Sequence, residues 1–315
     1  MLQFIASFLI LLNPIFGIIP PGQTPLIKDA SPEAFFIDAG DYQLPISGQA
    51  FLASELLPIY PVRNWNTPEP DITAKTALIF DATRQKIIWQ KNGLDEPRPI
   101  ASITKLMTAL VVTENSKMDD IFTVSKEAIG TYGEMGDLKV GEQLTVKDLL
   151  FALLLESSND AAEALRENLK NTGDKDLVKL MNQKTKELGL QNTSYTDPSG
   201  LDSKNQSSAR DLIKIMQEVL KNQTLEDILK SPSADIVSAD GLFKHHFTST
   251  NKLLQRFPEL LGGKTGYTEE AGNCMIIAFK APNNQEAIIS VLMDSQDRMN
   301  ESASLIEWTK RAFLW

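Results

Sequence analysis

The chain has 315 residues, of which 42% are hydrophobic and 23% are charged, which is enough for one large core or for a domain with appendages. Its 31 Lys and Arg residues against 41 Asp and Glu residues give a net charge of −10, which argues against nucleic acid as a partner. The single cysteine, Cys274, excludes a disulfide within the chain and a cysteine metal cluster, and its apolar surroundings predict a buried strand thiol.

Residues 1–19 are predicted to be a hydrophobic signal peptide or a membrane anchor. No charged residue lies between Leu2 and Ile19, but a basic start and a small-residue cleavage site are both lacking, and Asn13 and Pro14 interrupt the apolar run. We therefore expect an exported protein, in the cell-wall space or on the extracytoplasmic face of the membrane. Residues 2–19 would then offer a membrane attachment.

Residues 20–72 are predicted to be a proline-rich linker, because ten of the 16 prolines fall within the first 70 residues. Phe35, Phe36 and Phe51 are also compatible with a small packed subdomain. The folded domain is expected over residues 73–315, beginning with a hairpin of two strands at residues 76–80 and 86–90.

Ser102 is predicted to lie in the first turn of a helix, with Lys105 one turn further on the same face. The apolar residues Leu106 and Leu110 give the helical spacing. A lysine amine can accept the proton of a serine hydroxyl if burial and a second nearby cation lower its pKa. The pattern is not specific by itself, because Ser-x-x-Lys recurs at residues 249–252.

Ser157 and Asn159 form a Ser-x-Asn motif on a tight turn between two predicted helices. The first helix starts at a capping box of Thr145 and Asp148, and the second covers residues 160–169. The serine and the asparagine could also simply cap these helices. This motif recurs as well, at residues 203–205.

The rest of the chain predicts an α+β fold. Helices are expected at residues 177–188, 209–220 and 298–313, and strands at residues 264–266, 273–280 and 286–293. Strands at both ends predict one antiparallel sheet, flanked by the C-terminal helix and fronted by a mostly helical lobe. The active site would lie in the cleft between them, with Ser102 and Ser157 on the lobe and Lys264 on a sheet edge.

The order Ser-x-x-Lys, Ser-x-Asn and Lys-Thr-Gly, the last at residues 264–266, is that of the penicillin-recognising serine enzymes. Over residues 73–315 the chain resembles the D-alanyl-D-alanine carboxypeptidases, which are low-molecular-mass penicillin-binding proteins with a β-lactamase/transpeptidase-like fold. Ser199-Gly200-Leu201-Asp202 and the run through Tyr267 and Thr268 add to the resemblance.

The resemblance implies a role for each motif residue. Ser102 would attack the bond between the two terminal D-alanines of a peptidoglycan stem peptide and form an acyl-enzyme, while Lys105 takes its proton. Ser157 would pass a proton to the leaving D-alanine, and Asn159 would orient Lys105 or the substrate amide. The family also implies β-lactams as inhibitors. The sequence contains no metal cluster or nucleotide-binding loop, so no cofactor or metal is expected, and the domain is expected to be a monomer although the sequence leaves the oligomeric state open.

The sheet edge would bind the substrate. Lys264 would keep the cleft positive, which would lower the pKa of Lys105 and attract the substrate carboxylate. The backbone N–H groups of Ser102 and Tyr267 would hold the oxyanion, and Thr265 beside Gly266 would bind the terminal carboxylate together with Arg298. Arg298 could equally be a solvated residue of the first helical turn.

Two residues depart from the family pattern, and three alternative functions remain open. Ser158 replaces a common glycine, and Glu156 replaces an apolar residue or proline. A D,D-endopeptidase would use the same residues. A class A β-lactamase is less favoured, because the nearest Glu-x-x-Leu-Asn candidate, at Glu167, has its leucine one place early. An inactive wall-binding or penicillin-sensing module would not need the intact motifs.

Overall fold

The computed structural model describes residues 61–130, 137–283 and 287–315. The predicted hydrophobic segment at residues 1–19, and the predicted linker up to residue 60, lie outside these ranges. Within them, no helix combines the length and the apolar character that a membrane crossing requires.

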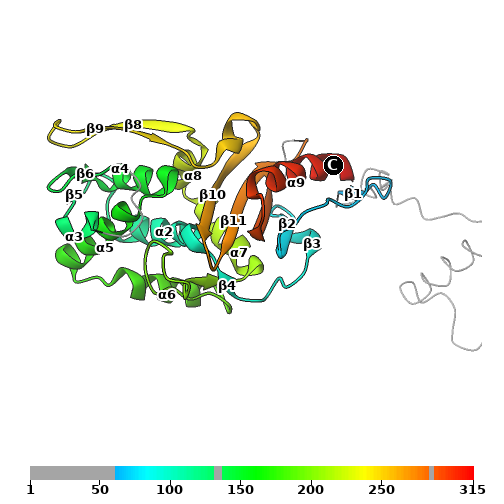
Figure 1. The fold of residues 1–315 in the computed structure, drawn as a ribbon, viewed down its shortest axis with the longest axis horizontal. Helices are drawn as coiled ribbons and strands as arrows, with labels where there is room; N and C mark the ends of the chain where they lie inside the picture. Colours follow the sequence, from blue (N-terminus) through cyan, green and yellow to red (C-terminus); the bar gives the residue numbers. More distant parts are fainter. Residues whose placement is uncertain (1–60, 131–136, 284–286) are drawn as a thin grey trace, which may run out of the picture. The chain divides into compact units, whose positions relative to one another are not determined.

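A five-stranded antiparallel sheet joins the two ends of the domain, as the strand pattern predicted (Figure 1). The strand order is β10-β11-β12-β2-β3, so the N-terminal hairpin pairs with the last long strand. The strands are β2 (Thr76–Asp81), β3 (Lys86–Lys91), β10 (Leu260–Thr268), β11 (Gly272–Lys280) and β12 (Ala287–Ser295). Strand β10 lies at one edge, which leaves one side of its backbone open.

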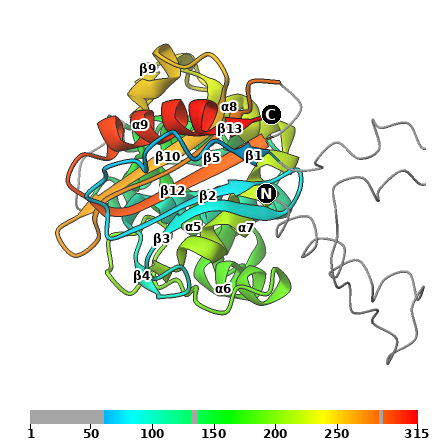
Figure 2. The same ribbon diagram turned by 90° about the vertical axis from the view of Figure 1, so that its right-hand side faces the viewer.

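The sheet separates two hydrophobic cores, because successive side chains of a strand point to opposite faces. Along β11, Ile276 and Ala278 belong to the core shared with the helical lobe, whereas Ile277 and Phe279 belong to the core under α9 (Arg298–Ala312). Figure 2 shows α9 on one side of the sheet and α7 (Ala209–Lys221) on the other. The predicted α+β arrangement is therefore confirmed.

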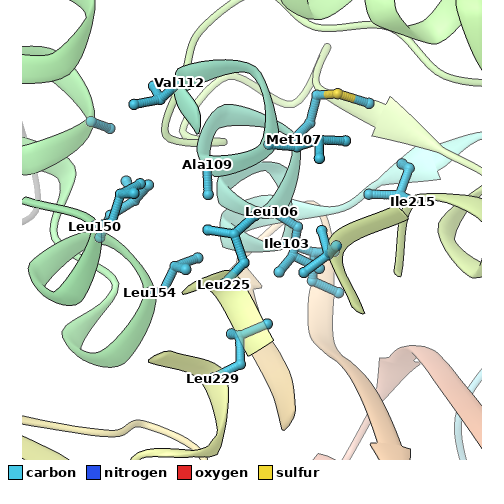
Figure 3. Close-up of a cluster of buried hydrophobic side chains, with 14 of the residues drawn as sticks. Ile103, Leu106, Met107, Ala109, Val112, Leu150, Leu154, Ile215, Leu225 and Leu229 are labelled. Carbon is cyan, nitrogen blue, oxygen red and sulfur yellow. The ribbon is translucent and has the colours of Figure 1, made fainter. Parts of the chain in front are cut away.

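The helical lobe is built around α2 (Lys105–Asn115), in which eight consecutive residues from Lys105 to Val112 are buried. Figure 3 shows Leu106 and Ala109 of α2 facing leucine side chains from neighbouring helices. The surrounding helices are α4 (Val146–Phe151), which continues as a π-helical turn (Ala152–Glu156), α5 (Asn159–Gly173), α6 (Leu177–Glu187) and α8 (Gln223–Lys230). A helix packed on all sides holds its first turn rigidly, and that turn carries Lys105.

The sequence prediction missed α8 and two surface hairpins. The hairpins are β5 (Ile121–Thr123) with β6 (Gln143–Thr145), and β8 (Ser233–Val237) with β9 (Lys244–Thr248). These strands are short and largely polar, so their pairing depends on distant partners and not on local pattern. The remaining elements are β4 (Arg98–Pro99), α3 (Lys126–Ile129), β7 (Gln206–Ser207) and the 3₁₀ turns Ala101–Thr104 and Lys252–Gln255.

The packed part of the chain reaches back to residue 61, twelve residues before the predicted boundary at residue 73. Strand β1 (Val62–Arg63) pairs with β13 (Phe313–Leu314), and the indole of Trp308 donates a hydrogen bond to the Pro68 carbonyl at 2.7 Å. The prolines of this stretch suggested a linker, but an extended proline-rich segment can also lie along a sheet and a helix.

Candidate active site

Ser102 lies in the 3₁₀ turn that leads directly into α2. The turn begins with Ala101 at a φ of 47°, and the backbone of Gly200 packs directly against it. A Cβ atom on Gly200 would lie 2.0 Å from the Ala101 carbonyl oxygen, so only glycine fits there. Because of this close approach, the loop containing Ser199 packs against the turn containing Ser102.

The amine of Lys105 is fully buried and surrounded by three oxygen atoms. Its Nζ lies 2.8 Å from Ser102 Oγ, 2.7 Å from Asn159 Oδ1 and 2.8 Å from the Ser199 carbonyl oxygen. The last two oxygens can only accept hydrogen bonds. A neutral amine would donate its two N–H groups to them, which leaves its lone pair facing the Ser102 hydroxyl.

Burial lowers the pKa of Lys105 to about 7, although the Asp197 carboxylate nearby favours the charged form. Asp197 was not among the predicted site residues. It accepts hydrogen bonds from the backbone N–H groups of Ser199, Gly200 and Asp202, which hold its own pKa below the usual value although burial opposes this. The carboxylate therefore fixes the loop whose carbonyl oxygen touches Lys105.

Ser157 ends the π-helical turn after α4, with a left-handed φ of 67°. Its Oγ accepts a hydrogen bond of 2.8 Å from Lys264 Nζ, which also donates to the Thr265 carbonyl at 3.0 Å. The pKa of Lys264 is well below its ordinary value because of burial, and then because of the charges of Lys105 and Arg298. Burial is the main cause of the lowered pKa of Lys105, and the two buried amines also repel each other when both are charged, as the sequence predicts.

The edge strand β10 runs alongside the Ser102 turn, because Gly266 has no side chain. A Cβ atom there would lie 2.7 Å from the Ile100 carbonyl and 3.2 Å from the Ser102 backbone nitrogen. The backbone of Tyr267 follows at once, whereas its side chain is 58% exposed. The structure therefore brings together the two backbone segments that were predicted to hold an oxyanion.

Thr265 and Arg298 also lie at this edge. The Thr265 hydroxyl shares a hydrogen bond of 2.8 Å with Thr250, which the sequence prediction missed, and Arg298 Nη1 donates to the Gly266 carbonyl at 2.8 Å. Arg298 is thus anchored in the site and is not merely a solvated residue of the first helical turn.

Most of the predicted site residues line one cleft of about 870 Å³. It is lined by Ser102, Ser157, Asn159, Thr265, Gly266, Tyr267 and Arg298, while Lys105 and Lys264 lie behind Ser102 and Ser157. Gly200, Leu201, Thr250, Glu269 and Glu270 are among its other lining residues. In the ranges that the structure describes, no group of three or more His, Cys, Asp or Glu side chains is placed to hold a metal ion.

The second copies of the motifs do not form such a site. Lys252 Nζ contacts the Ser249 backbone carbonyl and not its hydroxyl. Asn205 instead fixes the Asp197 loop through its side-chain amide. Tertiary contacts therefore distinguish the two Ser-x-x-Lys sequences, which the pattern could not.

The two departures from the family pattern have structural partners. The Ser158 hydroxyl caps α5 by accepting a hydrogen bond of 3.0 Å from the Ala161 backbone N–H. Glu156 accepts a hydrogen bond of 3.2 Å from the Thr248 backbone N–H at the end of β9. Both contacts hold the turn that carries Ser157, whose own hydroxyl remains directed toward Lys264.

Comparisons with known proteins agree with this geometry. A family model described as D-alanyl-D-alanine carboxypeptidase matches residues 64–297. The chain is 32% identical to the D-alanyl-D-alanine carboxypeptidase DacF of Bacillus subtilis over 246 residues, which are 76% of this chain but only 62% of that relative. It is 31% identical to a D-alanyl-D-alanine endopeptidase of Pseudomonas aeruginosa, over 72% of this chain and 73% of the relative.

A solved structure has the same fold. The crystal structure of a D-alanyl-D-alanine carboxypeptidase from Mycobacterium tuberculosis superposes with a TM-score of 0.70 at 28% identity. The match covers 79% of this chain and 95% of that structure.

Proposed function

Since the chain belongs to the D-alanyl-D-alanine carboxypeptidase family, we propose that it is a serine D-alanyl-D-alanine carboxypeptidase. It would remove the terminal D-alanine from peptidoglycan stem peptides through an acyl-enzyme on Ser102. The observation that carries this proposal is the set of three oxygen neighbours around Lys105 Nζ, because it suits a neutral amine aimed at the Ser102 hydroxyl.

Acylation begins with the transfer of the Ser102 proton to Lys105. The serine oxygen bonds to the carbonyl carbon of the penultimate D-alanine, and negative charge gathers on the carbonyl oxygen. The backbone N–H groups of Ser102 and Tyr267 would stabilise that charge, and loss of one such donor generally costs about 10² to 10³ in rate.

Expulsion of the terminal D-alanine requires a proton on its nitrogen. The Ser157 hydroxyl, hydrogen-bonded to Lys264, is suited to deliver it as the carbon–nitrogen bond breaks. The proton that Lys105 took from Ser102 then replaces the one that Ser157 gave, so that Lys105 is neutral again. Water would then attack the ester carbon, with Lys105 as the base, and release Ser102 and the shortened peptide. Asn159 would keep Lys105 in position through the contact of 2.7 Å between them.

The terminal carboxylate of the substrate fits the cationic side of the cleft. Thr265 and Arg298 line the cleft there, with Lys264 buried behind Ser157, and a guanidinium group binds a carboxylate with good geometry. Arg298 is therefore proposed as a carboxylate ligand, and this role separates an exopeptidase from a hydrolase that ignores the chain end.

The proposed substrate places the protein outside the cytoplasm, where peptidoglycan lies. Residues 2–19 are proposed to direct export and to attach the domain to the membrane, because they contain no charged residue. We further propose that the protein acts as a monomer, since all motif residues come from one chain.

The endopeptidase function is kept as a second candidate because a relative of that name is 31% identical over most of its length. The β-lactamase alternative loses support, since Glu167 does not line the cleft and instead accepts a hydrogen bond from Ser125. An inactive module would have no use for the buried lysine with a lowered pKa.

The decisive experiment is intact-protein mass spectrometry of the whole chain mixed with benzylpenicillin, followed by peptide mapping. The expected result is one stable adduct on Ser102, which is absent in Ser102→Ala and retained in Ser249→Ala. No adduct with intact drug would favour the inactive module, and no adduct with consumed drug would favour the β-lactamase. Release of D-alanine from a pentapeptide, compared with cleavage of a cross-linked dimer, separates carboxypeptidase from endopeptidase.

A further inference from the structure

All four tryptophans of the chain belong to one aromatic cluster, at the place where β1 pairs with β13. They are Trp65, Trp89, Trp308 and Trp315. The ring of Trp308 lies 5.7 Å from that of Trp89 and 5.7 Å from that of Phe313, which in turn lies 6.0 Å from Trp315. The Arg63 guanidinium joins Trp65 to the others, at 5.3 Å from its ring and 4.8 Å from that of Trp308. Figure 1 shows β1 at the end of the domain away from the helical lobe.

The side chain of Trp65 is 82% exposed, although the turn that carries it is well fixed. The Asn64 backbone N–H donates a hydrogen bond of 2.7 Å to the Ala312 carbonyl, and the Thr67 N–H donates one of 3.1 Å to the Asn64 carbonyl. Arg63 Nη2 closes the turn with a hydrogen bond of 2.8 Å to the Thr67 carbonyl. An ordered turn therefore presents a large apolar ring to the outside of the domain.

Two further apolar side chains are exposed beside this turn. Val62 and Leu314 are direct partners in the β1–β13 pair, so they share one face of it. Arg311 is also exposed, and its carbonyl accepts a hydrogen bond of 3.4 Å from the Thr67 hydroxyl. It forms no ion pair with any residue that the structure describes, so its charge is available to a ligand there.

This combination of groups suits the surface of a lipid bilayer. Tryptophan is enriched where lipid meets water, because its ring is apolar and its N–H is polar. An arginine beside it can bind lipid phosphate groups. The position of the cluster in the chain agrees, since the domain begins at residue 61 and the uncharged residues 2–19 precede it.

We propose that Val62, Trp65 and Leu314 dock the domain on the lipid surface to which residues 2–19 attach it. About 40 residues lie between that segment and the domain, and such a chain can span up to about 140 Å, so attachment alone would not hold the domain at the bilayer. Attachment does raise the effective concentration of lipid, so that a small docking surface is sufficient. The inference uses the proposed attachment but not the proposed peptidase activity.

Docking through this surface would leave the cleft free of lipid. Helix α9 runs from Arg298, which lines the cleft, to Ala312, whose carbonyl binds the turn of Trp65. A helix of 15 residues is about 22 Å long, so the docking surface and the cleft lie at opposite ends of it. The cleft of the docked domain would therefore stay open to peptidoglycan.

Tryptophan fluorescence tests the proposal, because residues 1–60 contain no tryptophan and the cluster holds all four. The whole chain is reconstituted into vesicles of phosphatidylethanolamine and phosphatidylglycerol whose acyl chains are brominated near the headgroup, since bromine quenches tryptophan on contact. The proteins compared are wild type, L314D and the matched control L242D. Leu242 is 75% exposed and Leu314 71%, but Leu242 lies in the turn between β8 and β9.

The expected result is a loss of about a quarter of the emission in wild type and in L242D, relative to unbrominated vesicles, because Trp65 is one of four tryptophans. L314D should lose little, because its carboxylate would have to leave water for the variant to dock. Circular dichroism of each variant checks that it is folded.

Unquenched wild type on vesicles that it binds, or equal quenching of L314D and L242D, would overturn the inference. A change in emission on adding isolated glycan strands, without quenching by lipid, would assign the cluster to wall polysaccharide instead. Failure of the whole chain to bind vesicles would refute the attachment and this inference together, whereas the adduct on Ser102 tests the peptidase separately.

Discussion

The rate of acylation by benzylpenicillin should depend on pH through the buried amine of Lys105. This amine has to be neutral to accept the Ser102 proton, and its pKa is lowered from 10.5 to about 7. The neutral fraction is then about one half at pH 7 and falls roughly tenfold for each pH unit below that. We expect acylation at pH 5 to be about 100-fold slower than on the plateau above pH 8.

Burial is the physical origin of this activation, and its contribution can be estimated. A lysine with the ordinary pKa of 10.5 would be neutral in only about one molecule in 3,000 at pH 7. The desolvated site therefore raises the population of the reactive form by about three orders of magnitude at neutral pH. The same shift predicts that the acidic limb of the rate profile lies near pH 7 and not near pH 10.

The assay is a rapid-quench time course of the Ser102 adduct by mass spectrometry, from pH 5 to pH 10 at constant ionic strength. Circular dichroism at each pH is the control for unfolding. A flat profile between pH 5 and pH 9 would refute Lys105 as the base of this reaction. A rate that keeps rising tenfold per unit up to pH 10 would refute the lowering of its pKa by burial.

Three further outcomes follow from the contacts around the cleft. In D197N the carboxylate that favours the charged lysine is lost, so the acidic limb should move to lower pH by about half a unit to one unit, whereas the exposed control D202N should leave it in place. G200A should prevent acylation and destabilise the fold, because its Cβ would lie 2.0 Å from a backbone oxygen. The control G189A also has a positive φ but open space around it, so its free energy of unfolding in urea should fall by only about 1 kcal/mol. R298Q should raise KM for a peptide with a free terminal carboxylate but not for the same peptide amidated at its end, and an equal rise for both would count against a carboxylate contact.

The local part of the site could be predicted from the sequence. A spacing of three residues in a helical turn places Ser102 and Lys105 on one face in almost any tertiary context. Short polar residues between two strong helical patterns likewise placed Ser157 and Asn159 on a turn. The positions of these four residues on their turns were predicted correctly because they depend only on residues that are close in the sequence.

The long-range part could not be predicted. The Ser199 group that touches Lys105 is a backbone carbonyl, which carries no residue signature, and Asp197 acts through a loop that only the fold brings to the site. Thr250 reaches Thr265 because its backbone N–H bonds to Leu155 in the lobe.

The sequence by itself determined which groups could react and in what order along the chain, because those are matters of residue type and local spacing. Only the tertiary structure decided in which of the two Ser-x-x-Lys sequences the lysine amine contacts the serine hydroxyl, and what the pKa of that amine is. Both answers depend on burial, since the free energy of a charge is set by the water and the dipoles around it and not by its neighbours in sequence.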